Sequence, residues 1–214
     1  MANGTGGSIT SFFTIWTEPR ATIRRIVDAD PKRNVIALAA IGPAINALAG
    51  QWAKALGNNA NLSVLWPLSV AGSVAIQAGL GVIGLFIGAA ILKWSGGLLG
   101  GVASRVEVRA AIAWSQIPGI AAEIVLLIAV LTGVPAPQAA AAGTLPHIDP
   151  AFYKILIVEV VLGIWGGIIG LYCIAEVHRF SASRAFCATL IPALVAAVVL
   201  GFVVFVIYAL GGHH

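Results

Sequence analysis

The sequence predicts an all-α, polytopic integral membrane protein with five transmembrane helices and a short N-terminal interfacial amphipathic helix. Only 9% of its 214 residues are charged and 59% are hydrophobic, whereas a soluble domain has about 25% charged and about 45–50% apolar residues. The chain also contains 25 glycines, and glycine is frequent in membrane helices because it allows close packing. These observations disfavour a water-soluble fold.

Five apolar stretches are long enough to cross a hydrocarbon core of about 30 Å, which takes about 20 helical residues. They are residues 34–56, 64–92, 110–134, 153–175 and 185–210. Together they make a membrane domain over residues 34–210, preceded by an N-terminal segment of residues 1–33. Residues 211–214 form a tail whose two histidines resemble a purification-tag remnant.

The N-terminal segment is expected to contain two helical pieces. Spacing at i, i+3, i+4 and i+7 gives the first an apolar face that we expect to lie on the bilayer; it consists of Ile9, Phe12, Phe13 and Trp16. Thr17 is the expected N-cap of the second piece, with Pro19 in its first turn and Asp28 near its end. The segment is either an anchor on anionic lipid or a docking surface for a protein partner.

The distribution of basic residues predicts the orientation in the membrane. Ten of the twelve Lys and Arg residues lie before the first span or in the second and fourth connecting loops, and the remaining two are Lys54 and Lys154 at span ends. Short loops rich in Lys and Arg stay in the cytoplasm. We therefore expect a cytoplasmic N-terminus and a C-terminus outside. In the second loop, Ser104 and Glu107 match a capping box that would start the third helix.

Each of the first four spans carries at least one strongly polar residue on a stripe of small residues. These residues are Asn46, Gln77, Glu123 and Glu159. At a rise of about 1.5 Å per residue they lie about 18, 22, 20 and 25 Å from the cytoplasmic ends of their spans. The four polar side chains can therefore share one layer of the membrane interior.

Two interpretations of this polar cluster remain open. Carboxyl groups in the membrane must be protonated, paired, or close to water or a cation, because an isolated charge there is costly. The cluster either binds a cation or relays a proton, or it consists of neutral carboxyls that hold the helices together through hydrogen bonds.

A second candidate site is a charged cytoplasmic surface. Its members come from the N-terminal segment and from the second and fourth loops: Arg20, Arg24, Arg25, Arg105, Glu107, Glu176, His178 and Arg179. The alternatives are ordinary salt bridging at a membrane boundary and a partner-binding surface.

Catalytic and cofactor sites are not indicated by the sequence. H-E-x-x-H, G-x-S-x-G and G-x-x-x-x-G-K are absent, so zinc protease, serine hydrolase and nucleotide-binding functions lack their essential groups. His147 and Asp149 are too few for a metal site. No basic run with interleaved aromatics suggests nucleic-acid binding. We expect no cofactor, no metal and no enzymatic activity.

The order of features resembles the Yip family of Ypt-interacting membrane proteins. The matching stretches are TEPRATIRRI before the first span, the pair Gly100-Gly101, AIAWSQIPG in the third span, and AEVHRFSASRA between the fourth and fifth spans. The resemblance covers residues 12–208 and implies a five-span bundle with a cytoplasmic N-terminus. Eukaryotic members of this family interact with Rab-type GTPases and with each other, whereas many bacterial members have no assigned activity.

This chain has a much shorter segment before the domain than the eukaryotic members, which makes GTPase binding doubtful. Its Ala- and Gly-rich spans favour a bacterial inner membrane. We expect a non-enzymatic scaffold or interaction protein whose partners are membrane lipid and either a second copy or another membrane protein. The alternative is a channel or transporter for a cation, a proton or a small solute, using the polar cluster.

Overall fold

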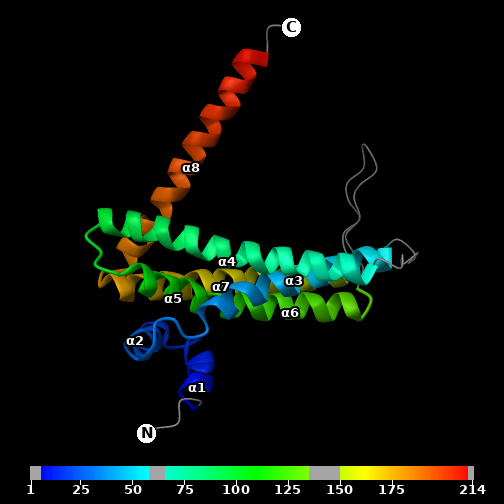
Figure 1. Cartoon of the computed structure of the whole chain (residues 1–214), viewed down its shortest axis with the longest axis horizontal. Helices are drawn as coiled ribbons and strands as arrows, with labels where there is room; N and C mark the ends of the chain where they lie inside the picture. The colour runs from blue at the N-terminus through cyan, green and yellow to red at the C-terminus, as the bar shows by residue number, and fades with distance from the viewer. Residues whose placement is uncertain (1–5, 58–65, 135–149, 212–214) are drawn as a thin grey trace.

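The structure, a computed structural model, describes residues 6–57, 66–134 and 150–211 (Figure 1). Within these ranges it is helical, without strands. The helices are α1 (Gly6–Thr14), α2 (Pro19–Ala29), α3 (Val35–Gly57), α4 (Trp66–Leu98), α5 (Arg105–Ser115), α6 (Ile117–Leu131), α7 (Pro150–His178) and α8 (Ala182–Gly211).

Four helical segments of the described residues are long and apolar enough to cross a membrane: α3, α4, α5 together with α6, and α7. They correspond to the first four predicted spans. α4 extends to Leu98, beyond the predicted end at residue 92. The fifth predicted span falls on α8, where the described apolar stretch covers only Ala182–Val195. The count of five spans therefore stays a prediction.

The long helices run side by side, and α8 diverges from them (Figure 1). α3 packs against both α4 and α6, and α6 packs against α7. α8 contacts α4 and α7. The two N-terminal helices lie against one end of this bundle (Figure 1), where α2 contacts α5 and α7.

The third predicted span is divided into α5 and α6. Pro118 has no N–H to donate to the carbonyl of Trp114 four residues earlier, so regular helical bonding is interrupted there. Gln116 joins the two helices in a right-handed helical conformation. At the start of α5 the predicted capping box is confirmed: Ser104 N donates to Glu107 Oε2 at 2.6 Å, and Glu107 N donates to Ser104 Oγ at 3.3 Å.

The N-terminal segment differs from the prediction in two respects. The N-cap of α2 is Glu18 rather than Thr17, because the helix begins directly at Pro19. Phe12, which was expected to lie on the bilayer, instead packs against Trp114 with the ring centroids 5.0 Å apart, whereas Phe13 is 72% exposed. An interfacial position of α1 remains a prediction.

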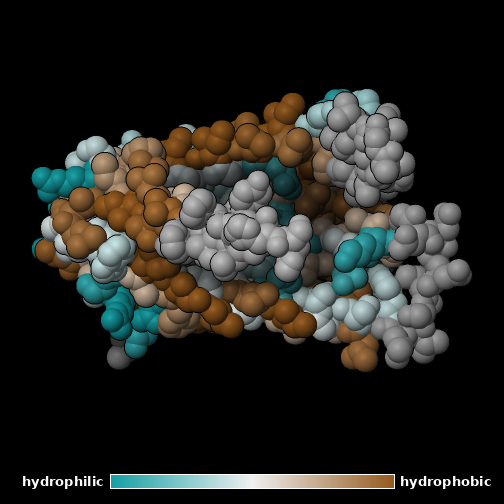
Figure 2. Space-filling model, turned by 90° about the horizontal axis from the view of Figure 1, so that it is seen from above, coloured by the Kyte–Doolittle hydropathy of each residue, from teal (hydrophilic) through white to brown (hydrophobic). Residues whose placement is uncertain are grey.

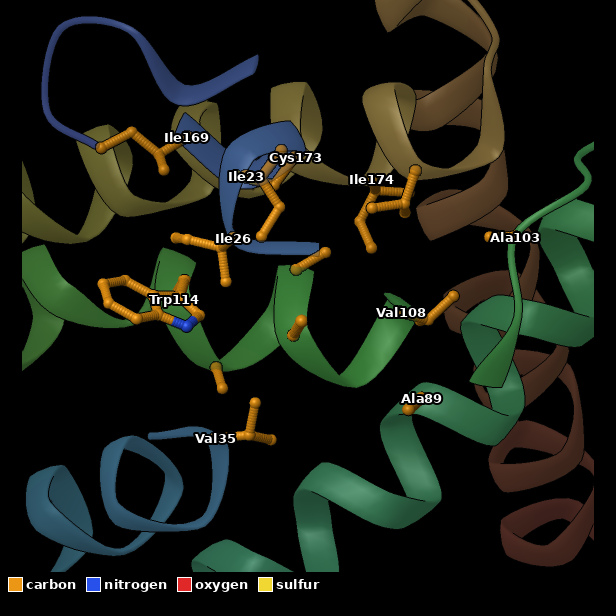
Figure 3. Close-up of a cluster of buried hydrophobic side chains, with 14 of the residues drawn as sticks. Ile23, Ile26, Val35, Ala89, Ala103, Val108, Trp114, Ile169, Cys173 and Ile174 are labelled. Carbon is orange, nitrogen blue, oxygen red and sulfur yellow. The ribbon is translucent and has the colours of Figure 1, made fainter. Parts of the chain in front are cut away.

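Part of the hydrophobic core lies where α2, α5 and α7 meet (Figure 3). Ile23 and Ile26 of α2 are buried there beside Trp114 of α5 and Ile174 of α7. The indole Nε1 of Trp114 donates to the carbonyl oxygen of Arg33 at 3.2 Å. The N-terminal segment is therefore part of the folded core and fixes the end of the bundle against which it packs.

Glycine allows the closest helix contact. A Cβ at Gly81 of α4 would overlap the carbonyl oxygen of Ala39 on α3 and would lie 2.7 Å from Pro43 Cγ. Gly81 of α4 therefore faces α3. The outer loop predicted after residue 134, with His147 and Asp149, lies outside the described residues.

Candidate functional site

A polar cleft lies between the long helices. Its volume is about 530 Å³, and its walls come from α3, α4, α6 and α7 and from the junction of α5 with α6. The polar residues that line it are Asn46, Gln77, Ser115, Gln116 and Glu123. Three of the four residues of the predicted polar cluster therefore line one cavity.

Asn46 and Glu123 are directly hydrogen-bonded in this cleft. Asn46 Nδ2 donates to Glu123 Oε2 at 2.8 Å. The bond joins α3 to α6 across 77 positions of sequence. The bond gives Glu123 Oε2 a partner and leaves Glu123 Oε1 and Asn46 Oδ1 for other partners.

Glu159 lies outside the lining of the cleft but close to it. Its carboxyl group is near enough to Glu123 for the two groups to interact electrostatically. Its Oε1 is buried and has no hydrogen-bond partner among the described residues. Two neighbouring carboxyl groups in a low-dielectric interior cannot both be charged unless a counter-ion lies close to them. Without a counter-ion, the pair holds at least one proton.

The helix break brings two polar residues to the cleft, Ser115 and Gln116. The spacing in the sequence predicts Gln116 on the same helix face as Glu123, whereas Ser115 was not predicted. The interruption before Pro118 positions them at the junction, and Ser115 Oγ donates to the carbonyl of Ile112 at 2.8 Å. On the opposite wall, a Cβ at Gly166 would lie 3.5 Å from the carbonyl oxygen of Ser115. The signal in the sequence is the polar pair Ser115-Gln116, which is separated from Pro118 only by Ile117 inside an apolar span.

The lining of the cleft is acidic. Of the described residues that line it, Glu123 is acidic and none is basic. Figure 2 shows apolar side chains along the molecule, with hydrophilic side chains at its ends and in a hollow between two apolar ridges. The arrangement can accept hydrogen bonds or compensate a positive charge.

The second predicted site is a cluster of charged residues that we call the charged end. It consists of Arg20, Arg24, Glu107, Glu176 and Arg179. Arg24 Nε donates to Glu176 Oε1 at 3.0 Å, and Arg24 Nη2 donates to the carbonyl oxygen of Glu176 at 2.8 Å. Arg20 Nη1 lies 3.8 Å from Glu176 Oε2. These contacts attach α2 to the last turn of α7.

Other predicted surface residues lie around this ion pair. Glu107 interacts electrostatically with Arg24 and Arg179. Arg25 pairs with Glu18 at 3.9 Å, and both side chains are more than half exposed. Arg105 and Arg179 are exposed. The structure therefore gathers residues from the N-terminal segment and from two connecting loops at one end of the bundle.

His178 differs from its predicted place on the accessible surface. It is 1% exposed, and its ring stacks on Phe180 with the centroids 5.0 Å apart. Both ring nitrogens lack a hydrogen-bond partner among the described residues. The ring fits against Gly96 and Gly101, and the His178 carbonyl oxygen accepts a hydrogen bond from Val102 N at 3.3 Å. His178 is thus a packing residue that joins α7 to the end of α4.

Four helical segments with the length and hydropathy of membrane spans, packed as a bundle, define an integral membrane protein. The Yip1 domain family model matches residues 13–205, and the chain belongs to this family. The matched region includes the polar cleft and the charged end. No curated protein and no solved structure matches the chain at a significant level. Within the described residues, no group of three or more His, Cys, Asp or Glu side chains could hold a metal ion.

Proposed function

We propose that this protein is a non-enzymatic membrane scaffold that binds its partners at the charged end. The single observation that carries the proposal is the attachment of α2 to α7 through Arg24 and Glu176. This attachment, together with the buried core beneath α2, makes the N-terminal segment and the two loops one rigid surface. A preorganised surface loses less conformational entropy on binding than a mobile one.

The charges that remain exposed suggest the chemistry of the partner. Arg105, Arg179 and Arg184 are exposed at this end, and Arg25 is only weakly paired. The partner surface is therefore acidic and belongs to a second copy of this chain or to another membrane protein. Because basic residues favour the cytoplasmic side, we place the charged end in the cytoplasm of a bacterial cell, at the inner membrane. GTPase binding is not part of the proposal.

Membrane lipid is the second proposed partner. A groove of about 150 Å³ lies between the start of α3, α4 and α5 and contains the basic residues Lys32 and Arg109. Its apolar wall includes Val35 and Phe86, and the Arg109 guanidinium lies 4.7 Å from the centroid of the Phe86 ring. Basic groups above an apolar wall fit an anionic phospholipid headgroup with its first acyl carbons.

The scaffold proposal is tested by crosslinking and affinity capture from native membranes. The double variant Arg105→Glu/Arg179→Glu reverses two exposed charges without touching the Arg24–Glu176 pair. Lys54→Glu is the matched control, because Lys54 is also exposed but lies at the other end of α3. We expect the captured partner or self-association to be lost in the double variant and kept in the control.

Two results would contradict the scaffold proposal. One is native membranes that yield neither a partner nor self-association for the wild-type chain. The other is equal capture by the wild type and by the double variant while both remain folded.

Transport of a cation or a small solute is a second candidate function, and the polar cleft favours it. The test is cation and proton flux in proteoliposomes, comparing the wild type with Glu123→Gln/Glu159→Gln. Flux that the double substitution abolishes would support transport. Flux no greater than that of empty liposomes would exclude it and leave the carboxyl groups to other roles.

A further inference from the structure

Several oxygen acceptors in the lining of the polar cleft have no hydrogen-bond donor given to them by another described residue. Asn46 Nδ2 donates to Glu123 Oε2, which leaves Glu123 Oε1 and Asn46 Oδ1 as acceptors. Gln77 and Gln116 add two amide oxygens to the lining. Ser115 Oγ uses its proton on the carbonyl of Ile112, so its lone pairs are also available as acceptors. The cleft is thus rich in oxygen atoms from four helical segments.

The charge around the cleft is also uncompensated within the described residues. Glu123 forms no salt bridge there, and its near neighbour Glu159 is another carboxyl group with a buried, unpartnered Oε1. A charged carboxylate midway along a membrane helix needs a counter-charge, because its transfer from water is costly. Oxygen donors together with a negative charge are the ligands that alkali cations and ammonium groups prefer.

The size of the cleft indicates the state of the ion. A volume of about 530 Å³ far exceeds a bare ion, and one water takes about 30 Å³ in the liquid. The site therefore has room for a cation with part of its water shell, or for a small protonated amine that brings its own N–H donors. The amide oxygens of Gln77 and Gln116 can coordinate an alkali ion, and they can accept hydrogen bonds from its water shell or from an ammonium group.

We propose that this cleft is a binding site for a monovalent cation, either a partly hydrated alkali metal ion or a small protonated amine, with Glu123 as the charged ligand. Asn46 positions the Glu123 carboxylate through its hydrogen bond. Glu159 is a second carboxyl group close to Glu123. Binding of this kind goes beyond the scaffold function. It is an equilibrium property of the site, so it holds whether or not ions cross the membrane.

The test is the thermal unfolding midpoint of the purified full chain in nanodiscs of neutral lipid. Ionic strength is kept constant with choline chloride, whose quaternary ammonium group has no N–H donor, and choline chloride is replaced stepwise by sodium, potassium or methylammonium chloride. A ligand that binds only the native state raises the midpoint increasingly with its concentration, as the logarithm of that concentration once it exceeds the dissociation constant. We expect a rise of about 3 °C at a concentration about tenfold above the dissociation constant. The alkali and methylammonium arms identify which kind of cation the site takes.

Glu123→Gln should abolish this rise, because it removes the charge while keeping the shape of the side chain. Glu18→Gln is the control, because Glu18 is an exposed carboxylate outside the cleft, and it should keep the full rise. If Glu123→Gln fails to fold, Gln77→Leu replaces it. Gln77 is exposed on α4, and its loss should weaken the apparent cation affinity at least about threefold, which is about 0.65 kcal/mol.

Either of two results would overturn the proposal. The first is a wild-type midpoint that is the same in all four chlorides, as expected for a cleft whose carboxyls are protonated and neutral. The second is an equal rise in the wild type, in Glu18→Gln and in the cleft variants, which would locate the effect elsewhere. This experiment measures equilibrium stability. A failure of the flux or capture experiments therefore does not change its outcome or the cation-binding proposal.

Discussion

The imidazole of His178 occupies the space that a side chain at Gly101 would fill. A Cβ added at Gly101 would overlap the imidazole Nδ1, and one added at Gly96 would lie 2.5 Å from Cε1. In the turn that follows α4, Gly101 N donates to the carbonyl oxygen of Gly96, and Gly100 has a φ of 82°. This glycine-capped turn brings the end of α4 against the last residue of α7. The contact fixes the spacing of the two helices at the charged end.

Gly96→Ala should therefore destabilise the protein, whereas Gly97→Ala should not. Both glycines lie in the last turn of α4, but a Cβ at Gly97 meets nothing within 4 Å. Forcing a methyl group into the His178 contact should lower the free energy of unfolding by about 1–3 kcal/mol. Gly97→Ala should raise it by up to about 1 kcal/mol, since alanine is the better helix former. The measurement is thermal unfolding in detergent. Equal midpoints for the two variants would contradict this prediction.

The contact between α3 and α4 leads to a similar prediction for Gly81 of α4. Gly81→Ala would overlap the carbonyl oxygen of Ala39, which is backbone and cannot move aside as a side chain can. We expect a loss of about 2 kcal/mol or more. Gly79→Ala, two residues earlier on the same helix with nothing within 4 Å, is the control and should be neutral or stabilising. The comparison uses the same unfolding assay. A Gly81→Ala variant that is as stable as Gly79→Ala would contradict the close contact between α3 and α4.

Much of the fold could be predicted from the sequence because membrane spans depend on a local property, the length of an apolar run. The same holds for the capping box at Ser104, whose two hydrogen bonds join residues three apart. The pairing of Arg24 with Glu176 could not be predicted, because 152 positions separate the two residues and no periodicity connects them. His178 was assigned to the surface because its neighbours Glu176 and Arg179 are charged.

The polar cluster could be predicted only in part, because only some of its geometry depends on local properties of the sequence. Depth along a span is a local property, so Asn46, Gln77 and Glu123 could be placed in one layer. Whether a residue faces the cleft depends on the rotation of each helix, and Glu159 lies beside the cleft rather than in its lining. Ser115 and Gln116 lie at the break before Pro118, and the position of the residues at such a break does not follow from regular helix periodicity.

Arg179 has a backbone conformation that favours glycine. Its φ is 58°, and the turn after α7 is closed by Phe180 N donating to the carbonyl of Ala175 at 3.0 Å. For a residue with a Cβ, the left-handed conformation costs about 1–2 kcal/mol. Arg179→Gly should therefore be more stable to unfolding than Arg179→Ala by about 1 kcal/mol, since both remove the same charge. If the two variants unfold at the same temperature, the positive φ is not maintained in solution.

A double-mutant cycle on Arg24 and Glu176 should give a larger coupling energy than one on Glu18 and Arg25. The side chains of the first pair are 28% and 25% exposed with a 3.0 Å contact, whereas those of the second are 66% and 56% exposed at 3.9 Å. Half-buried, hydrogen-bonded pairs are less screened by solvent, so we expect a coupling of about 1 kcal/mol for the first and less than about 0.5 kcal/mol for the second.

The cycle for the first pair uses Arg24→Ala, Glu176→Ala and the double variant. The bond from Arg24 Nη2 to the Glu176 carbonyl oxygen persists in Glu176→Ala, so the coupling energy reports the side-chain ion pair alone. High salt should reduce the coupling of the exposed pair more than that of the half-buried pair, because screening acts most strongly on solvated charges. Equal couplings for both pairs would mean that α2 is held by its buried face, through Ile23 and Ile26. The ion pair would then contribute to the charge of the surface and not to its rigidity.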